Sequence, residues 1–520
     1  MKNRKRSHAV TMAALTVFIV LSFACATNQP DNSSGQTANV AESQSQIVTS
    51  QPETGINERE VATRDTSDNL NENIPAGTVT AVTDVTVSPD SASVDRGNSR
   101  QFSATVSGIG NPNQTVTWTI SGNTSRGTNI NADGVLTVAE DETLTTLTIT
   151  ATSTADTSKN GNAAVAVTQG ITTFNVTNVY TWNSAINAIR NGGYGQTYII
   201  NVIGNITVPV IAENLFGAVR DLTVTIQGNG TLSINTTGNL LQIGSGQTVI
   251  IRQVTLRGHQ NNNASLVLIR NGGSFRMEDN ASVTGNTRVN TGGGGGVYVD
   301  GGIFTLSGGT ISGNTASGGN LSGGGSGGGV FVNGGTFTMS GGTISGNTGR
   351  AGSIIGGQSV GGGGGVYVYS GTFTLSGGTI SGNTSSGYNA VNGGGGVLVY
   401  GGNFIMQGGT ISGNTESGYY AINGGGGVLV YGGNFTMQGG TISGNTVSSQ
   451  NNSGGGGVFV NNGNFTKTGG IIYGRDASLN FRNTAAGQGH AVYWSSGNRW
   501  RNATAGVGDS SNNDVFWTND

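Results

Sequence analysis

One pattern recurs six times between Val297 and Ile472, and it limits the folds that this chain can adopt. Each copy opens with a Val, and a Phe and an Ile follow the Val after seven and fourteen residues. The leading valines are Val297, Val330, Val366, Val397, Val428 and Val458. The spacing within a copy is constant, whereas successive copies begin 33, 36, 31, 31 and 30 residues apart. Constant apolar spacing with one variable loop is typical of a solenoid in which each copy forms one coil.

Glycine separates the apolar segments within each coil. The copy GGGGGVYVDGGIFTLSGGTISGNT, residues 292–315, contains three short apolar segments, and the chain has 94 Gly in all. We expect these Gly residues to form tight corners and to adopt positive φ. Three strands per coil predict a parallel β-helix over residues 175–520, with its repeats at about 290–475 and less regular coils before them.

A short helix is predicted at the start of the solenoid. Trp182, Ala185, Ile186 and Ile189 fall at helical spacing, and Gly192 follows as a stop signal. Because uncovered edge strands pair readily with other chains, we expect this helix to cap the first coil.

Residues 79–168 show a different pattern, with about seven short alternating segments separated by turn residues, which predicts a β-sandwich. The sequences VTVSPDSASVDRGNSRQFSATV, VTWTI, NADGVLTV and LTITATS resemble the bacterial Ig-like domain of group 2 (BIG2). The resemblance implies an Ig-like module that serves as a spacer or adhesive unit. We expect Trp118 to plug the core between its two sheets.

The repeated stem SGGTISGNT resembles the repeats of polymorphic outer-membrane proteins and of pectate-lyase-like β-helices. This resemblance implies a right-handed coil. The predicted fold class is therefore all-β: an Ig-like β-sandwich followed by a right-handed parallel β-helix solenoid with a short N-terminal capping helix.

Residues 1–26 have the pattern of a signal peptide, with a basic start, an apolar run and a small-residue cleavage region. Cys25, the only cysteine, ends the segment LSFAC, which resembles a bacterial lipobox with Ser22 where Leu is usual. The resemblance implies lipidation of Cys25 and anchoring at the cell surface or outer membrane. Cleavage after Ala26 would instead give a secreted protein. Residues 27–78 are polar and lack aromatic residues, which predicts a disordered tether.

One face of the coils is predicted to carry an aromatic ladder. The third residue after each leading Val is polar or tyrosine, a mixture that favours the outside, and strand alternation then places the first residue outside as well. The candidate ligand-binding residues are Tyr298, Phe331, Tyr367, Tyr369, Tyr400 and Tyr431. They either stack to stabilise the coils or form a platform for a glycan or a host or cell-surface protein.

A second column recurs in the stem of each repeat. It consists of Asn314, Asn347, Asn383, Asn414 and Asn445. We expect a structural ladder of amide hydrogen bonds, as in pectate-lyase-type folds. Arg475 holds this place in the last copy, which predicts that the ladder ends at Asn445.

Charged residues are scarce in the repeats. Only Asp300, Arg350, Glu416 and Lys467 are charged between residues 290 and 470. Glycoside hydrolysis needs a pair of carboxyls, and elimination needs basic residues with calcium-binding acids, so we predict no catalytic residue there. The early coils hold Arg252, Arg257, His259, Glu278 and Asp279. These residues leave a polysaccharide lyase or glycoside hydrolase as the alternative function.

Other ligand classes are also disfavoured. The net charge is −3 and no basic face is evident, so we expect no nucleic-acid partner. Three histidines and one cysteine without zinc spacing predict neither a metal site nor a cofactor. The sequence therefore predicts a monomeric, non-catalytic surface scaffold or adhesin that displays a β-helix rod.

Overall fold

The computed structural model describes residues 79–501, except for 211–212, 290–291, 319–325, 352–358, 388–389, 419–423, 449–453, 475–476, 486–488 and 496–497. The predicted signal peptide, Cys25 and the tether lie outside the described residues, as does segment 502–520. No helix among the described residues has the length and apolar character needed to cross a bilayer.

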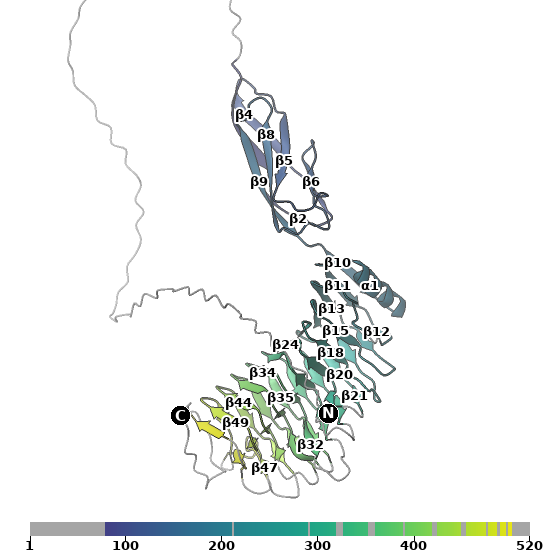
Figure 1. Ribbon diagram of the computed structural model, residues 1–520, viewed down its shortest axis with the longest axis vertical. Helices are drawn as coiled ribbons and strands as arrows, with labels where there is room; N and C mark the ends of the chain where they lie inside the picture. The colour runs from purple at the N-terminus through teal and green to yellow at the C-terminus, as the bar shows by residue number, and fades with distance from the viewer. Residues whose placement is uncertain are drawn as a thin grey trace, which may run out of the picture. The chain divides into compact units, whose positions relative to one another are not determined.

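Residues 81–168 form a β-sandwich, as the alternating pattern predicts (Figure 1). Its strands are β1 (Ala81–Ser88), β2 (Ser91–Asp95), β3 (Ser99–Gln101), β4 (Ser103–Ile109), β5 (Val116–Ser121), β6 (Asn129–Ile130), β7 (Val135–Thr137), β8 (Thr146–Ser153) and β9 (Asn160–Thr168). They pair as β1-β4, β2-β9-β8-β5 and β3-β7-β6. Phe102, Leu136 and Ile149 are buried in the common core, whereas Trp118 is only partly buried and packs on that core rather than filling its centre.

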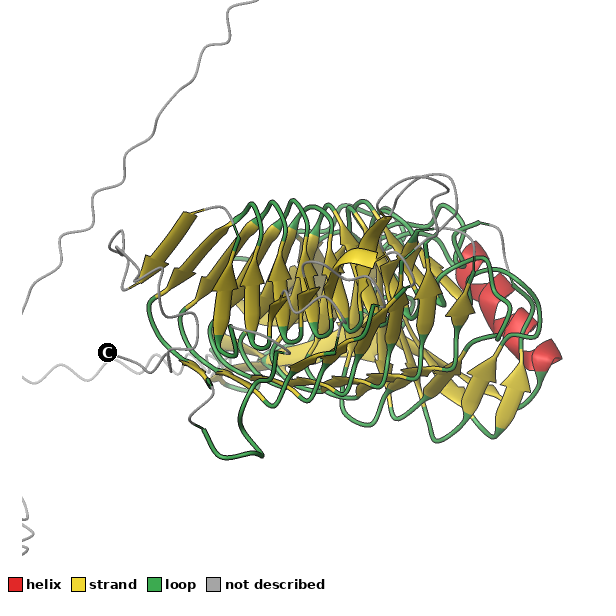
Figure 2. Ribbon diagram, turned by 90° about the horizontal axis from the view of Figure 1, so that it is seen from below, coloured by secondary structure: helices red, strands yellow, loops and turns green. Residues whose placement is uncertain are grey.

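The remaining strands form a parallel β-helix built around three long sheets, which confirms the predicted solenoid (Figures 1 and 2). Sheet 1 contains β10 (Ile171–Val176), β11 (Thr197–Val202), β13 (Leu222–Gln227), β16 (Gln247–Arg252), β19 (Ser274–Met277), β24 (Ile303–Leu306), β29 (Thr336–Met339), β34 (Thr372–Leu375), β39 (Asn403–Met406), β44 (Asn434–Met437), β49 (Asn464–Lys467) and β52 (Asn498–Arg501). Sheet 2 contains β12 (Asn205–Thr207), β14 (Thr231–Ser233), β17 (Thr255–Arg257), β20 (Ser282–Thr284), β25 (Thr310–Ser312), β30 (Thr343–Ser345), β35 (Thr379–Ser381), β40 (Thr410–Ser412), β45 (Thr441–Ser443) and β50 (Ile471–Ile472).

Sheet 3 carries the leading valines of the repeats. It contains β15 (Leu241–Ile243), β18 (Val267–Arg270), β23 (Val297–Asp300), β28 (Val330–Asn333), β33 (Val366–Val368), β38 (Val397–Val399), β43 (Val428–Val430), β48 (Val458–Val460) and β51 (Val492–Trp494). Equivalent residues of successive coils pair directly, as Val297 does with Val330. The constant spacing of the repeat therefore sets the register of every sheet.

Two short sheets, 4 and 5, flank the loop between the stem of one repeat and the Gly run of the next. Sheet 4 contains β21 (Thr287–Arg288), β26 (Thr315–Ser317), β31 (Thr348–Arg350), β36 (Thr384–Ser386), β41 (Thr415–Glu416) and β46 (Thr446–Val447). Sheet 5 contains β22 (Gly293–Gly294), β27 (Ser326–Gly327), β32 (Ser359–Gly363), β37 (Ala390–Gly394), β42 (Gly424–Gly425) and β47 (Gly454–Gly455). The sequence pattern assigned this region to a variable loop and missed both sheets.

The main core runs along the inside of the coils. Phe304, Phe337 and Phe373 stack on successive coils with ring centroids 4.6 Å apart, and all three are fully buried. Stacked aromatic side chains add about 0.5–1.5 kcal/mol each beyond the burial of their apolar area. Each coil is thus stabilised mainly by the coils above and below it.

Helix α1 (Val179–Asn191) lies at one end of the coils, where Figure 2 shows it in red. Trp182, Ala185, Ile186 and Ile189 are buried in the main core, and Gly192 is the C-cap, as predicted. The strand β10 precedes this helix and pairs with β11, so the β-helix begins at Ile171 rather than at the predicted residue 175.

The Gly runs are required mainly by close backbone approach. A Cβ on Gly363 would lie 2.2 Å from the carbonyl oxygen of Val366, and one on Gly364 would lie 2.2 Å from that of Gly395. Positive φ occurs mainly in the stem, at residues such as Gly378 (83°) and Gly382 (62°), and at the corner after sheet 3, as at Gly371 (82°). Glycine therefore serves the two expected purposes at different corners of the coil.

Candidate functional site

The predicted asparagine column forms a continuous buried ladder. In Asn383, the side-chain Nδ2 donates to Asn414 Oδ1 at 2.9 Å and to the carbonyl oxygen of Ile344 at 2.8 Å. Its Oδ1 accepts from the backbone N and the Nδ2 of Asn347, at 3.0 and 2.9 Å. The same pattern links all five predicted members, which are fully buried: Asn314, Asn347, Asn383, Asn414 and Asn445. Their role is structural.

The ladder is longer than predicted at both ends. Asn445 Nδ2 donates to Asn483 Oδ1 at 2.9 Å, so the ladder does not end at Asn445. Toward the N-terminus, Asn262 Nδ2 donates to Asn286 Oδ1 at 2.9 Å, and Asn314 Oδ1 accepts from the backbone N of Asn286 at 3.2 Å. Constant spacing between the Ile of the stem and the ladder residue would place Arg475 in the ladder. A longer loop follows β50 instead, and the chain reaches the ladder position at Asn483.

The first residue after each leading Val points away from the main core, as predicted, but it is not exposed. Phe331 is 7% exposed and Tyr367 is 1% exposed, while Tyr298 is half-buried. Phe331 and Tyr367 belong to a second apolar cluster outside the main core, together with Leu398, Leu429 and Phe459, and Tyr298 packs against it. Strands of sheet 5 pack against this layer, β27 against β33 and β32 against β38. The expected exposed platform is therefore wrong for Phe331 and Tyr367.

The third residue after the leading Val forms the exposed part of the aromatic ladder. Tyr369 is 45% exposed, and Tyr400 and Tyr431 are half-buried. The rings of Tyr369 and Tyr400 stack at 5.3 Å, and those of Tyr400 and Tyr431 at 5.1 Å, with interplanar angles of 10° and 9°. We call these three residues the Tyr row. Neighbouring rings cover each other's faces, so the row presents ring edges and hydroxyl groups to a partner.

A glycine corner separates the Tyr row from a row of amides. Gly401 and Gly402 connect Tyr400 to Asn403, and the next coil repeats this arrangement from Tyr431 to Asn434. Asn434 Nδ2 donates to Asn403 Oδ1 at 2.8 Å, and Asn464 Nδ2 donates to Asn434 Oδ1 at 2.8 Å. We use the name corner strip for this turn between sheets 3 and 1 together with the Tyr row and the amides that border it. Our sequence interpretation missed its amides, although three consecutive Asn residues at one repeat position were a usable signal.

The corner strip opens into a polar groove of about 720 Å³ in the earlier coils. Arg270, Asp300 and Asn333 line it at the ends of β18, β23 and β28, and Gly301 and Gly335 lie beside them. Arg270 Nη1 lies 3.9 Å from Asp300 Oδ2, and Asn333 Nδ2 donates to Asp300 Oδ1 at 3.3 Å. The groove and the Tyr row occupy the same position in successive repeats.

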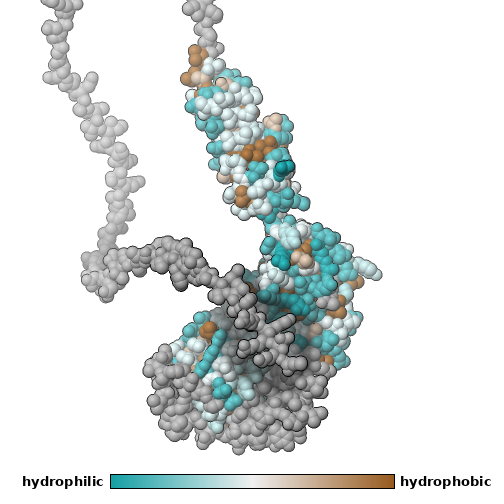
Figure 3. Space-filling view, viewed as in Figure 1, coloured by the Kyte–Doolittle hydropathy of each residue, from teal (hydrophilic) through white to brown (hydrophobic). Residues whose placement is uncertain are grey.

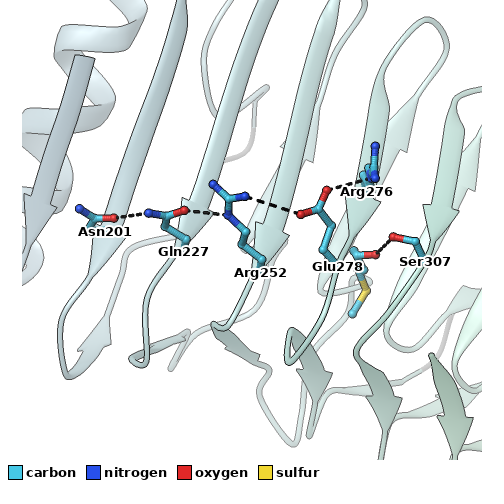
Figure 4. Close-up of polar contacts among 7 residues, drawn as sticks. Asn201, Gln227, Arg252, Arg276, Glu278 and Ser307 are labelled. Atoms are coloured by element: carbon cyan, nitrogen blue, oxygen red, sulfur yellow. Dashed lines mark hydrogen bonds and ion pairs between the residues drawn. The ribbon is translucent and has the colours of Figure 1, made fainter. Parts of the chain in front are cut away.

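Glu278, a residue of the alternative catalytic site, belongs to a chain of polar side chains along sheet 1 (Figure 4). Gln227 Nε2 donates to Asn201 Oδ1, and Arg252 Nε donates to Gln227 Oε1, both at 2.8 Å. Glu278 then forms ion pairs with Arg252 at 3.9 Å and with Arg276 at 3.0 Å. Its carboxylate is thus held between two guanidinium groups.

The other residues of that alternative are divided between two corners. Asp279 follows Glu278 at the corner between sheets 1 and 2, whereas Arg257 ends β17 and His259 lies at the next corner. There the backbone N of His259 donates to Asn286 Oδ1 of the buried ladder at 3.3 Å. Glu278 and His259 therefore lie at opposite ends of sheet 2 and do not form one cluster.

Glu416 is a buried carboxyl on β41, in the layer between sheets 4 and 5. It is fully buried, and Oε1 accepts from the backbone N of Gly418 at 2.8 Å. Among the described residues, Oε2 has no hydrogen-bond partner, and neither does the buried Oγ of Ser385 on the preceding coil. Burial raises the pKa of Glu416 to about 8. Among the described residues, no group of three or more His, Cys, Asp or Glu could hold a metal ion.

The surface of the described residues is mainly hydrophilic on the face drawn in Figure 3, with small, separate apolar areas. Large exposed apolar patches often mark interaction sites, but no such patch is visible on the coloured part of this face. The corner strip, with its mixture of tyrosine and amide groups, is the more specific candidate.

Comparison with known proteins gives a limited result. No family model matches the chain. The chain is 49% identical over 65 residues to the major capsid protein of Bacillus phage B103, which is 12% of this chain and 14% of the phage protein. The match spans only about one seventh of that relative, so it indicates similarity over a short segment and does not assign the chain to a family.

Proposed function

We propose that this chain is an exported surface protein whose β-helix is a non-catalytic scaffold or adhesin, and that the Tyr row contacts a glycan or protein partner. The observation that best supports this proposal is the Tyr row itself, which places three phenol groups on consecutive coils at an outer corner. Tyrosine combines an apolar ring with a hydrogen-bonding hydroxyl, and it is enriched at binding surfaces for this reason. Additional coils would lengthen such a surface without changing the fold.

The proposed location depends on the sequence of the N-terminal segment. Its basic and apolar pattern, with Cys25 at the end of a lipobox-like segment, supports export and a lipid anchor. The BIG2-like sequence of the sandwich supports a spacer or adhesive role between this anchor and the β-helix. A single acyl chain binds membranes weakly, so we expect lipidation with more than one chain.

The binding proposal is tested with a triple variant, Tyr369→Ala/Tyr400→Ala/Tyr431→Ala, on an array of glycans and extracellular matrix proteins. We expect the affinity for the bound partner to fall by about ten-fold or more, because tyrosines at the centre of an interface contribute strongly. Tyr180→Ala is the matched control, because Tyr180 lies on α1 and is 80% exposed. Unchanged binding by the triple variant would contradict the proposal.

A second triple variant separates binding from stacking. Phe at the same three positions keeps the ring stack but removes the hydroxyl groups. If the Ala variant unfolds while the Phe variant folds and binds like the native protein, the row is a stabilising stack whose hydroxyls are not used. Loss of binding with an unchanged circular dichroism spectrum in the Phe variant supports direct contact through the hydroxyls.

The anchor is tested by expressing the full chain in a bacterial host and labelling it with a fatty-acid analogue. We expect label in the native protein and none in Cys25→Ser, which should also leave the membrane fraction. An unlabelled native protein in the culture medium would support the secreted alternative.

The enzyme alternative is tested by measuring polysaccharide degradation with the same protein. Glycoside hydrolysis needs two carboxyls at a defined separation, and Glu278 is instead paired with two arginines. We expect no product release. Release that is lost in Glu278→Gln, but retained in Gln227→Ala on the same polar chain, would overturn the non-catalytic proposal.

A further inference from the structure

The corner strip has an unusual charge distribution for a surface of its length. On the sheet 3 side, the third residue after each leading Val is uncharged in the coils that follow Asp300. These residues are Asn333, Tyr369, Tyr400, Tyr431, Asn461 and Ser495. Across the corner, Thr372, Asn403 and Asn434 are also uncharged. The Arg270–Asp300 pair, whose charges are opposite, lies at the groove end. Neither side of the strip therefore offers an uncompensated charge to a ligand.

The floor of the strip is made of glycine backbone. A Cβ on Gly402 would lie 2.7 Å from the carbonyl oxygen of Gly371, and one on Gly433 would lie 2.3 Å from that of Gly402. A side chain is consequently excluded from the second position of the corner, whereas the first position can hold one, as Ser370 shows. The flanking Tyr and Asn side chains border a narrow strip that repeats with each coil, about 4.8 Å apart.

The polar side chains at the groove end are held in place by one another. Asn333 Nδ2 donates to the hydroxyl of Tyr298 at 3.2 Å as well as to Asp300, and its Oδ1 accepts from Ser370 Oγ at 3.2 Å. The backbone N of Gly334 donates to Ser370 Oγ at 2.8 Å. These contacts fix the amide and carboxylate before any ligand arrives, which lowers the entropy cost of binding.

We infer that the corner strip is one continuous site for a neutral, extended glycan, with the Arg270–Asp300–Asn333 groove as a polar subsite that prolongs the Tyr row. Hydroxyl-rich, uncharged sugars match alternating phenol, amide and carboxylate groups, each of which forms hydrogen bonds in a fixed orientation. An acidic glycan would require arginine or lysine that is free to pair with its carboxylates. This inference rests on the proposed binding role of the Tyr row.

The experiment measures affinity against chain length by titration calorimetry on the full chain. The probes are glucan, mannan and galactan oligomers of two to eight units, with oligogalacturonates of the same lengths as acidic probes. We expect a neutral series to bind more tightly as its length increases, with little change between about 50 and 500 mM salt, because no net charge is paired. Asp300→Ala/Asn333→Ala should reduce the affinity for the longest oligomers by about ten-fold, which is about 1.4 kcal/mol, and leave the shortest unchanged.

The outcomes separate this inference from the proposed function. Gln227→Ala is the matched control, an amide on the outer surface of sheet 1 away from the strip. If the Tyr triple variant loses all binding but the groove variant binds long oligomers like the native protein, the groove subsite is wrong and the Tyr row remains. If the groove variant loses binding and the Tyr triple variant does not, the Tyr row is wrong. Salt-sensitive binding of oligogalacturonates, or no binding of any neutral series, would overturn the neutral-glycan inference.

Discussion

Two buried glutamates, one in the sandwich and one in the β-helix, have opposite environments. Glu142 in the sandwich is 1% exposed, and its Oε1 accepts from the backbone N of Thr124 at 3.0 Å, from Thr124 Oγ1 at 2.6 Å and from the backbone N of Leu144 at 3.2 Å. Burial alone would raise its pKa, but these hydrogen bonds stabilise the carboxylate and lower the pKa to about 2. Glu416 in the β-helix accepts one hydrogen bond, and burial raises its pKa to about 8.

The difference shows how each region satisfies its buried polar groups. The sandwich encloses Glu142 in a local loop that supplies several donors to the carboxylate. The β-helix satisfies a buried amide through the same amide one coil away, as in the asparagine ladder. Glu416 has no equivalent neighbour, because Ser385 and Val447 occupy its position on the adjacent coils. In the interior of the coils, stacking therefore supplies hydrogen-bond partners to a buried polar side chain where the same residue recurs at that position on the next coil.

The largest expected effect comes from interrupting the ladder. Asn383→Ala removes the partners of the backbone N and Nδ2 of Asn347 and of the carbonyl oxygen of Ile344. Each buried group left without a partner costs about 1–3 kcal/mol, so we expect a loss of about 3–5 kcal/mol in the free energy of unfolding. The control is Asn434→Ala in the exposed amide row, which should change it by about 0.5 kcal/mol or less. Thermal or denaturant unfolding measures both variants. Equal losses in the free energy of unfolding for Asn383→Ala and Asn434→Ala would refute the special role of the buried ladder.

The next effect is a pH dependence of the β-helix set by Glu416. Its folded pKa is raised from 4.5 to about 8, so the folded state binds the proton more tightly than the unfolded state. Stability is therefore highest below about pH 4.5, falls as the pH rises and levels off above about pH 8, with a total loss of at most about 5 kcal/mol.

Hydrogen exchange of peptides spanning β40 and β41 measures this local dependence. Glu416→Gln keeps the shape of the neutral acid. At pH 5 its exchange rates should match those of the native protein, and at pH 9 the variant should exchange more slowly than the native protein. A native protein with equal protection at both pH values, after correction for intrinsic exchange, would show that Glu416 ionises without opening the layer.

A smaller effect of opposite sign is expected in the sandwich. The folded pKa of Glu142 lies below its ordinary value, so its stabilisation is present above about pH 4.5 and is lost as the pH falls toward about 2. Glu142→Gln should cost about 1–2 kcal/mol at pH 7, because an amide cannot accept every bond that the carboxylate accepts. Trp118 fluorescence and exchange of the loop after β7 report on this region. An identical acid response in the variant and the native protein would exclude Glu142 as the cause.

A similarly small effect is expected from removing a whole coil. Deletion of residues 397–427 joins Gly396 to Val428 and places Asn383 next to Asn445 in the ladder. Because the remaining positions still repeat, we expect an unchanged circular dichroism spectrum per residue and a loss of about 1–2 kcal/mol, less than for Asn383→Ala. A greater loss than that caused by the single amide substitution would mean that coils are not interchangeable.

The sequence predicted those features that depend on repetition and alternation. The spacing of Val, Phe and Ile predicted the three long sheets and their register, the helical spacing of Trp182 and Ile186 predicted α1, and the Asn column predicted the ladder. These features follow from local geometry, because residues one repeat apart must lie one coil apart. The binding role of the Tyr row and the location of the chain remain predictions.

Tertiary structure alone decided what covers each outward residue. Strand alternation places Tyr367 and Tyr369 on the same outer side, yet sheet 5 packs over the first position and leaves the third at the exposed corner. Likewise, Asn483 reaches the ladder only because a longer loop returns the chain to the column, and Glu416 is buried only because two added sheets enclose it. Sequence alternation determines the direction of a side chain, whereas its exposure depends on segments that arrive from elsewhere in the coil.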